Sequence, residues 1–343
     1  KVIGIDLAKT KFHLAAINYE NEVIYKKKIS RADFFASVKE LFPGDQTFAF
    51  EACGGSHYTA QKLKEYGYKV ILLKPKDVKS YAKQRQKNDI NDAIAICKAA
   101  CDPEIMRVHP KSKQEQQIAY LHKTRQNIIR QRIQRSNSIM TSLQEFGYIV
   151  DCGKSKFAKN CKTYLDDAFA KNYIEKAVYD QMELDQKEIE QLTGREKSIE
   201  KEIIVSNKSS QTARKLLKIP GIGEINASIL SNKPMTLYEN AKDFAASLGI
   251  VPKQNTTGGD IKLGRITKQG DRYARTMLIQ AGRAVVMRVA KKNPPQDEIY
   301  QFAQKLIKRG KPFNVACVAV ANKLARIAHA CVTQNTDYRD CNS

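Results

Sequence analysis

The chain has 343 residues, with 59 lysines and arginines against 36 aspartates and glutamates and a formal net charge of +23. This excess of positive charge favours a polyanionic partner, most simply a nucleic acid. No apolar run approaches the length of a membrane-spanning helix, and residues 1–10 lack the layout of a signal peptide, so neither a membrane protein nor a secreted one is expected. The length allows two or three domains.

Residues 1–100 alternate between strand and helix signals. Three β-branched, apolar runs come first and predict a strand meander. A helix, a strand, a second helix, a fifth strand and a third helix follow, and this order predicts a ribonuclease-H-like α/β domain over residues 1–105. The strands are predicted at 1–6, 11–18, 22–29, 47–52 and 69–73, and the helices at 31–42, 56–67 and from about Asp77 to Ala100.

Residues 106–208 follow a helical pattern. Apolar residues recur at spacings of three and four between 118 and 146, and again between 174 and 203. The run FGYIVDCGKSKFAKN between them breaks the pattern and is predicted to reverse the chain. Lys113 to about Asn207 is therefore predicted to form a helical hairpin or coiled coil. It is either a spacer or a dimerisation arm, and we favour the arm because such narrow apolar seams usually need a partner helix.

The polar run SNKSSQTARK precedes a mainly helical C-terminal domain, predicted for residues 209–343. Its first motif, KIPGIGEINASIL, matches a helix-hairpin-helix. In that motif the glycines, here Gly221 and Gly223, let backbone N–H groups approach a phosphate of a nucleic acid without regard to base sequence. The alternative is a tight turn that packs two helices together.

Four acids occupy strand ends or one helix face in the predicted α/β domain. Asp6 ends the first strand, Glu51 ends the fourth, and Asp89 and Asp92 share a helix face at a spacing of three. These positions are neighbours in a ribonuclease-H-like sheet, where convergent carboxylates raise one another's pKa. Bound Mg²⁺ or Mn²⁺ removes that cost, so the four acids are predicted to be metal ligands and catalytic residues acting on a phosphodiester.

The surroundings of the acid pair support this interpretation. Lys83, Arg85 and Lys87 precede it and are predicted to hold a phosphate backbone. Taken singly, each acid is more typical of a turn, a cap or a solvated face, and only the set of four is specific.

The run GIDLAKTK also fits the phosphate loop of an actin-like kinase. That fold needs further glycine-rich loops in a second, similar domain, and the helical middle has none.

The motif NTTGGDIKLGRITKQGDRYAR places Thr256 and Thr257 before two glycines in a loop rich in cations. A hydroxyl beside flexible backbone and positive charge is suited to attack a phosphate. The alternative, which this window alone favours, is a polar hairpin that touches a nucleic-acid backbone. The predicted nucleic-acid contacts of this motif are Thr256, Lys262, Arg265, Lys268, Arg272 and Arg275.

Five segments in fixed order resemble one family: GIDLAKTKFHLA, EACGGSHYTAQKL, KNDINDAIAI, IPGIGEINASIL and LGIVPKQNTTGGDIKLGRITKQGDRYARTMLIQAGRA. They are similar to the DEDD transposases of bacterial insertion sequences, the insertion-sequence one-ten family and especially its eleven-eleven subgroup, to which the pilin-gene invertases are related. The resemblance runs from the first strand to about Val332, with strict motifs at both ends and a looser middle.

The resemblance implies a RuvC-like N-terminal domain, a coiled-coil dimerisation segment and a C-terminal transposase domain. It implies a recombinase guided by a noncoding bridge or seeker RNA that pairs with both donor and target DNA. The family's acidic tetrad corresponds to Asp6, Glu51, Asp89 and Asp92, with Mg²⁺ or Mn²⁺ as cofactor. A hydroxyl at Thr257 would form a covalent 5′-phospho-enzyme link, and the acids of another subunit would complete a composite site. A homodimer is implied, with a tetramer in the synaptic complex.

Threonine at position 257 departs from the family, whose nucleophile is a serine. The additional methyl group crowds the oxygen and restricts χ1. Thr257 therefore acts as the nucleophile, or Thr256 does, or the chain assembles on DNA without efficient cleavage, and we favour Thr257. Tyr273 is a further possible nucleophile and ranks well below the threonines, as a contact to a nucleic-acid backbone or to RNA.

Three functions from different classes follow from the sequence. The first and favoured one is a transposase-recombinase with a covalent protein–DNA intermediate. The second is a metal-dependent nuclease or Holliday-junction resolvase, which uses the four acids with water. The third is a non-catalytic nucleic-acid-binding assembly protein. The eight cysteines are scattered, with Cys97 and Cys101 the closest pair, and predict reduced thiols in a cytoplasmic protein without a membrane partner.

Overall fold

The computed structural model describes residues 2–18, 20, 22–82, 89–257, 260–291 and 293–338, with side chains described for all of these except 255–257, 260 and 261. The backbone separates into two compact units, Lys1–Gln116 and Gln117–Ser343. The predicted division of the chain at residues 105 and 208 stays a prediction.

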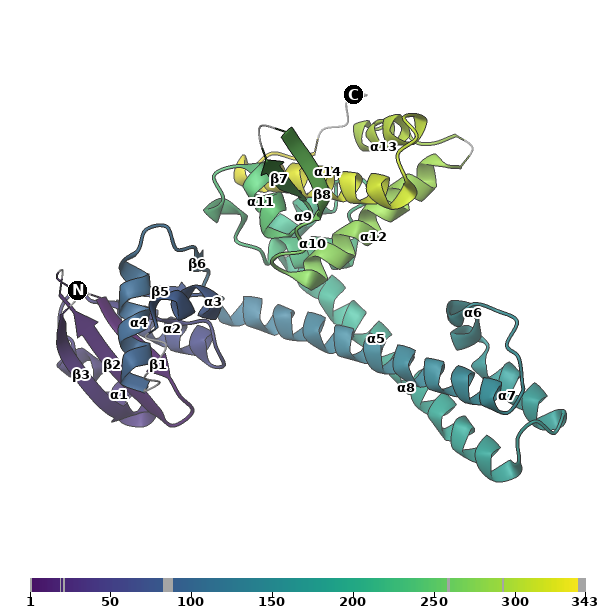
Figure 1. The fold of residues 1–343 in the computed structure, drawn as a ribbon, viewed down its shortest axis with the longest axis horizontal. Helices are drawn as coiled ribbons and strands as arrows, with labels where there is room; N and C mark the ends of the chain where they lie inside the picture. The colour runs from purple at the N-terminus through teal and green to yellow at the C-terminus, as the bar shows by residue number, and fades with distance from the viewer. Residues whose placement is uncertain are drawn as a thin grey trace. The chain divides into compact units, whose positions relative to one another are not determined.

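The N-terminal unit is built on a six-stranded sheet in the order β3-β2-β1-β4-β5-β6 (Figure 1). The first three strands form an antiparallel meander, β4 and β5 run parallel to β1, and β6 is antiparallel to β5. A mixed α/β domain that opens with a meander is thus confirmed. The strands are β1 (Val2–Leu7), β2 (Lys11–Ile17), β3 (Val23–Ser30), β4 (Thr47–Glu51), β5 (Lys69–Leu73) and β6 (Arg107–Val108).

The two faces of this sheet are covered by different helices. Successive strand residues point to opposite faces, and Ile3 and Ile5 of β1 join a core with Phe34 of α1 (Arg31–Leu41) and Leu63 of α2 (Ser56–Glu65). Between them, Gly4 faces α4 (Asp89–Cys101), and an added Cβ there would lie 2.3 Å from the carbonyl oxygen of Ala93. Helix α4 therefore lies directly on the backbone of β1.

The predicted helix from about Asp77 to Ala100 is wrong as one continuous element. The chain forms a short helix, α3 (Pro75–Val78), then a 3-10 turn, η1 (Lys79–Tyr81), and Ala82 is already extended. Proline at the first helical position favours a new helix start at residue 75. The second helix, α4, begins at Asp89. The two-residue strand β6 was not predicted, because so short a segment gives no alternating pattern.

The second unit contains a long helical hairpin formed by α5 (Lys113–Glu145) and α8 (Lys176–Ser209). Ion pairs link the two helices in antiparallel order: Arg125 lies 2.6 Å from Glu200, and Arg135 lies 3.0 Å from Asp185. The predicted helical hairpin agrees with this arrangement. Its coiled-coil character and its dimerisation role stay predictions.

The segment between the long helices was predicted only to reverse the chain, yet it forms α6 (Lys154–Lys159) and α7 (Cys161–Ala170). Phe157 of α6 and Leu165 of α7 are fully buried in a core that they share with Leu143 of α5 and Met182 of α8. Helices of six and ten residues carry too few turns for a clear apolar periodicity. The end of the hairpin therefore has a hydrophobic core of its own, which we call the arm tip.

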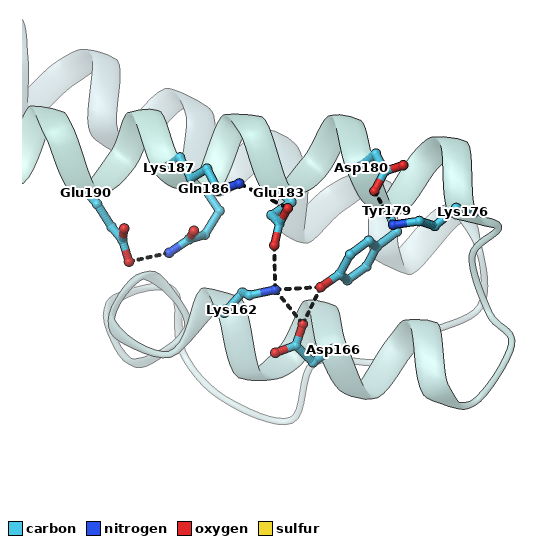
Figure 2. Close-up of polar contacts among 9 residues, drawn as sticks. All are labelled: Lys162, Asp166, Lys176, Tyr179, Asp180, Glu183, Gln186, Lys187 and Glu190. Atoms are coloured by element: carbon cyan, nitrogen blue, oxygen red, sulfur yellow. Dashed lines mark hydrogen bonds and ion pairs between the residues drawn. The ribbon is translucent and has the colours of Figure 1, made fainter.

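One lysine links the polar groups of the arm tip (Figure 2). Lys162 Nζ of α7 lies 2.8 Å from Asp166 Oδ1 and 2.8 Å from Glu183 Oε1 of α8. The Tyr179 hydroxyl donates a hydrogen bond to Asp166 at 2.7 Å. These contacts hold α7 against α8, and each acid of the group has a cation beside it.

The remainder of the second unit is helical apart from the two-stranded hairpin β7–β8. Helix α14 lies at its centre, because Val320 and Leu324 are fully buried among residues from α9 to α13. An added Cβ on Gly282 of α12 would lie 2.3 Å from the Cys317 carbonyl oxygen of α14, so these two helices are in close contact. The elements are α9 (Gln211–Leu216), α10 (Glu224–Ser231), η2 (Met235–Leu237), α11 (Ala241–Ser247), β7 (Pro252–Thr257), β8 (Asp260–Ile266), α12 (Arg272–Val289), α13 (Glu298–Lys308) and α14 (Phe313–Thr333).

Helix α14 corrects one expectation from the sequence. By length and composition alone its residues are apolar enough to cross a membrane, with a mean hydropathy of 1.4, whereas no such run was expected. Half of that window is buried inside the protein, as expected of a central core helix. The helix is apolar because α11, α12 and α13 pack around it.

Candidate active site

Asp6 and Glu51 lie side by side at one edge of the sheet. Strands β1 and β4 are parallel, with Ile5 opposite Phe50, so the residues that follow each of these leave the sheet at the same end. Asp6 shares a face with Gly4, and Glu51 shares a face with Ala49, which packs under α4. Both side chains therefore point to the face that α4 covers, and both are partly buried.

Asp89 and Asp92 come from the first turn of α4. The close contact of this helix with β1 brings that turn to the same edge of the sheet. The Asp89 side chain is 63% exposed, and Asp92 is exposed as well. All four predicted acids thus belong to one site, which we call the acidic site.

Electrostatic interactions connect the four carboxylates. The pKa of Asp6 is raised, first by burial and then by the negative charges of Asp92 and Asp89. Burial also raises the pKa of Glu51, with further contributions from Asp6 and Asp92 and an opposing one from Lys79. Carboxylates that are half-buried and repel one another favour binding of a cation, because the cation removes both costs.

His13 belongs to this site and was not predicted. It is 6% exposed and lies directly opposite Asp6 in the register of β1 and β2. Ligand atoms of Asp6, His13 and Asp89 all lie within 4.8 Å of one another. A signal was present in the sequence: in a tight meander, the second strand must return beside Asp6, and its alternate residues share the face of Asp6. Lys79, beside Glu51, was missed because η1 was expected to be part of a longer helix.

The predicted cations around the acid pair, Lys83, Arg85 and Lys87, lie outside the described residues. Their proposed contact with a phosphate backbone stays a prediction.

The two glycines of the motif KIPGIGEINASIL have different environments. Gly221 has a φ of +90°, and an added Cβ would lie 2.6 Å from Val285, so this glycine serves a tight, packed turn. Gly223 is exposed before the first turn of α10, with open space around it.

Thr256 and Thr257 are the last two residues of β7, opposite Ile261 and Asp260 of β8. They therefore lie at the end of a hairpin, as the polar-hairpin interpretation predicted. Their side chains lie outside the described part of the structure, and so do Gly258 and Gly259. The hairpin presents its end residues on a strand pair rather than on a long loop.

The cations that follow the threonines have two different environments. Lys262, Arg265, Lys268 and Arg272 are exposed, as a contact with a nucleic acid requires. Arg275 is 8% exposed, and its Nη1 donates hydrogen bonds to the carbonyl oxygens of Leu248 and Gln269, at 3.0 and 2.8 Å. This geometry favours a structural role for Arg275 over the predicted contact with a nucleic acid.

Tyr273, the lower-ranked nucleophile, is part of a buried polar network. Its hydroxyl lies 3.3 Å from His122 Nδ1 and accepts a hydrogen bond of 3.4 Å from Arg125 Nη1. Burial lowers the pKa of His122 to about 4, and its Nε2 lies 2.9 Å from the Ser228 hydroxyl. Burial also raises the pKa of Tyr273, which opposes formation of a phenolate nucleophile. The network joins α5, α10 and α12.

Known proteins match almost the whole chain. Residues 3–147 match the DEDD transposases of the IS110 type, and residues 213–301 match the family described as "Transposase IS116/IS110/IS902 family". A Pseudomonas aeruginosa protein named "Probable family 20 transposase" is 35% identical over 98% of both chains. The transposase for insertion sequence element IS1328 of Yersinia enterocolitica is 32% identical over 98% of this chain and 97% of its own. The transposase for IS1111A of Coxiella burnetii is 30% identical over 99% and 91%.

Proposed function

This chain belongs to the IS110 family of insertion-sequence DEDD transposases, enzymes of DNA recombination, and we propose that it is an RNA-guided recombinase that cuts and exchanges donor and target DNA strands. The observation that carries the proposal is the acidic site. Asp6, Glu51, Asp89 and Asp92 converge from two strands and a helix, and burial together with neighbouring carboxylates raises the pKa values of Asp6 and Glu51.

The donor set of the acidic site fits a divalent cation. Carboxylate oxygens are the ligands that Mg²⁺ and Mn²⁺ prefer, and the site brings four carboxyl groups together. We therefore propose that Asp6, Glu51, Asp89 and Asp92 hold Mg²⁺, with Mn²⁺ as an alternative. When bound, the cation would neutralise charge that develops on the phosphate. Asp6 and Glu51, fixed at strand ends, would set its position.

The hydroxyl of Thr257 is the proposed nucleophile, with Thr256 as the alternative. Its Oγ1 would attack the scissile phosphorus and form a phosphoester bond to the 5′ side, while the bond from phosphorus to the 3′ oxygen breaks. The hydroxyl proton leaves the threonine, and the departing oxygen gains one to become a 3′-hydroxyl. Exposed cations on and after the hairpin, such as Lys262 and Arg265, would stabilise the charged transition state.

The partners follow from charge and from the exposed surface. A net charge of +23 supports binding of donor DNA, target DNA and a noncoding guide RNA. Base pairing to the guide would select sequence, while the protein holds backbones. Apolar side chains on the long helices, including Ile133 (52% exposed) and Leu184 (54% exposed), support a second copy packing on the arm. In the proposed synaptic tetramer, Thr257 of one subunit would act with the acidic site of another, and strand exchange would proceed through a four-way junction.

Covalent trapping tests this proposal. Full-length protein and the noncoding RNA co-expressed from its element are mixed with labelled donor and target DNA and Mg²⁺, then resolved on denaturing gels. We expect a protein–DNA adduct that Thr257→Ala and Asp89→Ala abolish and that Thr256→Ala retains. Loss in Thr256→Ala with retention in Thr257→Ala would move the nucleophile to Thr256. An adduct seen only in Thr257→Ser would mean that threonine disables the native nucleophile.

The acidic site by itself also supports a second function, a nuclease or junction resolvase that activates water. That function needs no hydroxyl in the β7–β8 hairpin. In the same assay it predicts nicked DNA without an adduct, and nicking that is unchanged in Thr257→Ala but lost in Asp89→Ala. Salt-sensitive binding without cleavage in any divalent metal would instead indicate a non-catalytic assembly protein.

A further inference from the structure

The acidic site contains a histidine whose position is set by the sheet. His13 lies opposite Asp6 across the β1–β2 pair, and paired residues of an antiparallel ladder point to the same face. On that face the next residue along β2, Ala15, packs against Ala93 and Cys97 of α4. His13 is therefore enclosed between the sheet and the start of α4, and it is 6% exposed.

The Nδ1 atom of His13 points into the acidic site without a hydrogen bond. It is buried and has no hydrogen-bonding partner among the described residues. It lies 3.4 Å from Asp89 Oδ2, and His13 groups with the proposed ligands Asp89 and Asp6. A buried polar atom left without a hydrogen bond costs free energy, so its retention calls for a partner.

The distances around His13 suit a shared coordination shell. Metal–ligand bonds of 2.0–2.2 Å place two ligand atoms about 3 to 4 Å apart. The separation of 3.4 Å between His13 Nδ1 and Asp89 Oδ2 is in that range, and one ligand atom from each of Asp6, His13 and Asp89 lies within 4.8 Å of the other two. One cation among these three atoms would satisfy the Nδ1 lone pair and both carboxylates.

We propose that His13 Nδ1 is a direct ligand of the divalent cation in the acidic site and that it gives the site a preference for Mn²⁺ over Mg²⁺. The inference rests on the proposed function, because it requires a cation at these acids. Imidazole nitrogen binds transition metals well and Mg²⁺ poorly, whereas carboxylates accept both. A site with carboxylates alone would bind the two metals with a smaller difference in affinity.

Pulsed electron paramagnetic resonance on wild-type protein loaded with Mn²⁺ tests the ligand directly. A coordinated imidazole couples its ¹⁴N nucleus to the manganese electrons, and we expect that coupling in full-length protein without DNA. In parallel, Mn²⁺ affinity is measured by titration of the free-ion signal and Mg²⁺ affinity by competition. His13→Gln should lose the ¹⁴N coupling, weaken Mn²⁺ binding about tenfold and weaken Mg²⁺ binding by less than about threefold.

A matched control comes from the same unit of the protein. His109 Nε2 also lies 3.4 Å from a carboxylate, Glu115 Oε1, away from the acidic site. His109→Gln should leave the ¹⁴N coupling and both affinities unchanged. Manganese bound to wild type without ¹⁴N coupling, or an equal loss of Mn²⁺ and Mg²⁺ affinity in His13→Gln, would overturn the inference. If His13→Gln does not fold, the wild-type spectrum alone decides.

Asp6→Asn separates the inference from the function on which it rests. Loss of both metals in Asp6→Asn, together with ¹⁴N coupling in wild type, supports the metal site and its nitrogen ligand. Loss of both metals in Asp6→Asn without ¹⁴N coupling in wild type overturns the nitrogen ligand and leaves the carboxylate site in place. Unchanged metal binding in Asp6→Asn would overturn the proposed metal site and, with it, the role of His13.

Discussion

The acidic site and the arm tip both gather carboxylates, but they differ in what neutralises them. At the arm tip, Lys162 lies between Asp166 and Glu183, and hydrogen bonds from that lysine lower the pKa of both acids (Figure 2). At the acidic site, burial and like charges raise the pKa of Asp6 and Glu51. The arm tip is neutralised by a lysine of its own chain, whereas the acidic site is where we propose that a cation binds from outside.

This contrast separates structural from functional charge clusters. Ion pairs that the chain supplies itself hold elements together and contribute modestly to stability at the surface. Carboxylates that lie together without such partners repel one another and lower the stability of the folded state. Proteins keep such clusters where they bind a ligand or take part in a reaction. Three changes test this difference: removal of one acid from the acidic site, addition of a divalent cation, and removal of Lys162 from the arm tip.

The largest expected effect is on the reaction. Asp6→Asn removes a central ligand of the proposed cation, and we expect covalent adduct formation on DNA to fall on the order of 10³-fold. Without metal, Asp6→Asn should melt at a higher temperature than wild type, because the variant lacks one of the mutually repelling charges. Denaturing gels measure the adduct, and calorimetry measures the melting temperature. A lower melting temperature of metal-free Asp6→Asn than of metal-free wild type would show that the charge of Asp6 does not destabilise the acidic site, and would contradict its contrast with the arm tip.

Next in size is the stabilisation by metal. A cation that binds only the folded state stabilises it by about 2.7 kcal/mol when its free concentration is 100 times Kd. Saturating Mg²⁺ should therefore raise the melting temperature of wild type and of Lys162→Met, whose acidic site is intact. Asp6→Asn should show no such shift. If Lys162→Met abolished the metal-induced shift, the cation would bind at the arm tip and not at the acidic site.

A smaller effect is expected from removing the lysine at the arm tip. Lys162→Met leaves Asp166 and Glu183 without their shared cation, so the arm tip comes to resemble the acidic site. The melting temperature should fall by only a few degrees, because exposed ion pairs contribute little. Lys187→Met is the matched control, since Glu183, at 3.1 Å, is the one acid that pairs with Lys187 among the described residues, and it should have a smaller effect. Equal effects would mean that the shared position of Lys162 is unimportant.

Most of the acidic site could be predicted because it depends on local order along the chain. Strand ends and a helix face are enough to place Asp6, Glu51, Asp89 and Asp92, and the meander and the long hairpin follow from apolar periodicity. His13 required the register of two strands, which residue types alone do not give. The arm-tip helices were missed because their stability comes from tertiary burial of Phe157 and Leu165, which local periodicity does not record.

The smallest effect, and the most specific to the comparison, is the opposite pH dependence of the two clusters. Asp166 and Glu183 have folded-state pKa values below their unfolded values, so their contribution to stability is present above about pH 4 and is lost as pH falls through the folded values. Asp6 and Glu51 have raised values in the metal-free protein. Their contribution is present below about pH 4 and is lost as pH rises through the folded values.

Melting temperatures between pH 3 and pH 7, measured in chelator, therefore give two difference curves of opposite sign. Wild type minus Lys162→Met should be positive near pH 7 and shrink toward zero as the acids become protonated. Wild type minus Asp6→Asn should be negative near pH 7 and also approach zero at low pH, because asparagine resembles the protonated acid. Saturating Mg²⁺ should reverse the sign of the second curve at neutral pH and leave the first unchanged. Two curves of the same sign in chelator would mean that the acidic site is already neutralised within the fold, and the case for a cation there would fail.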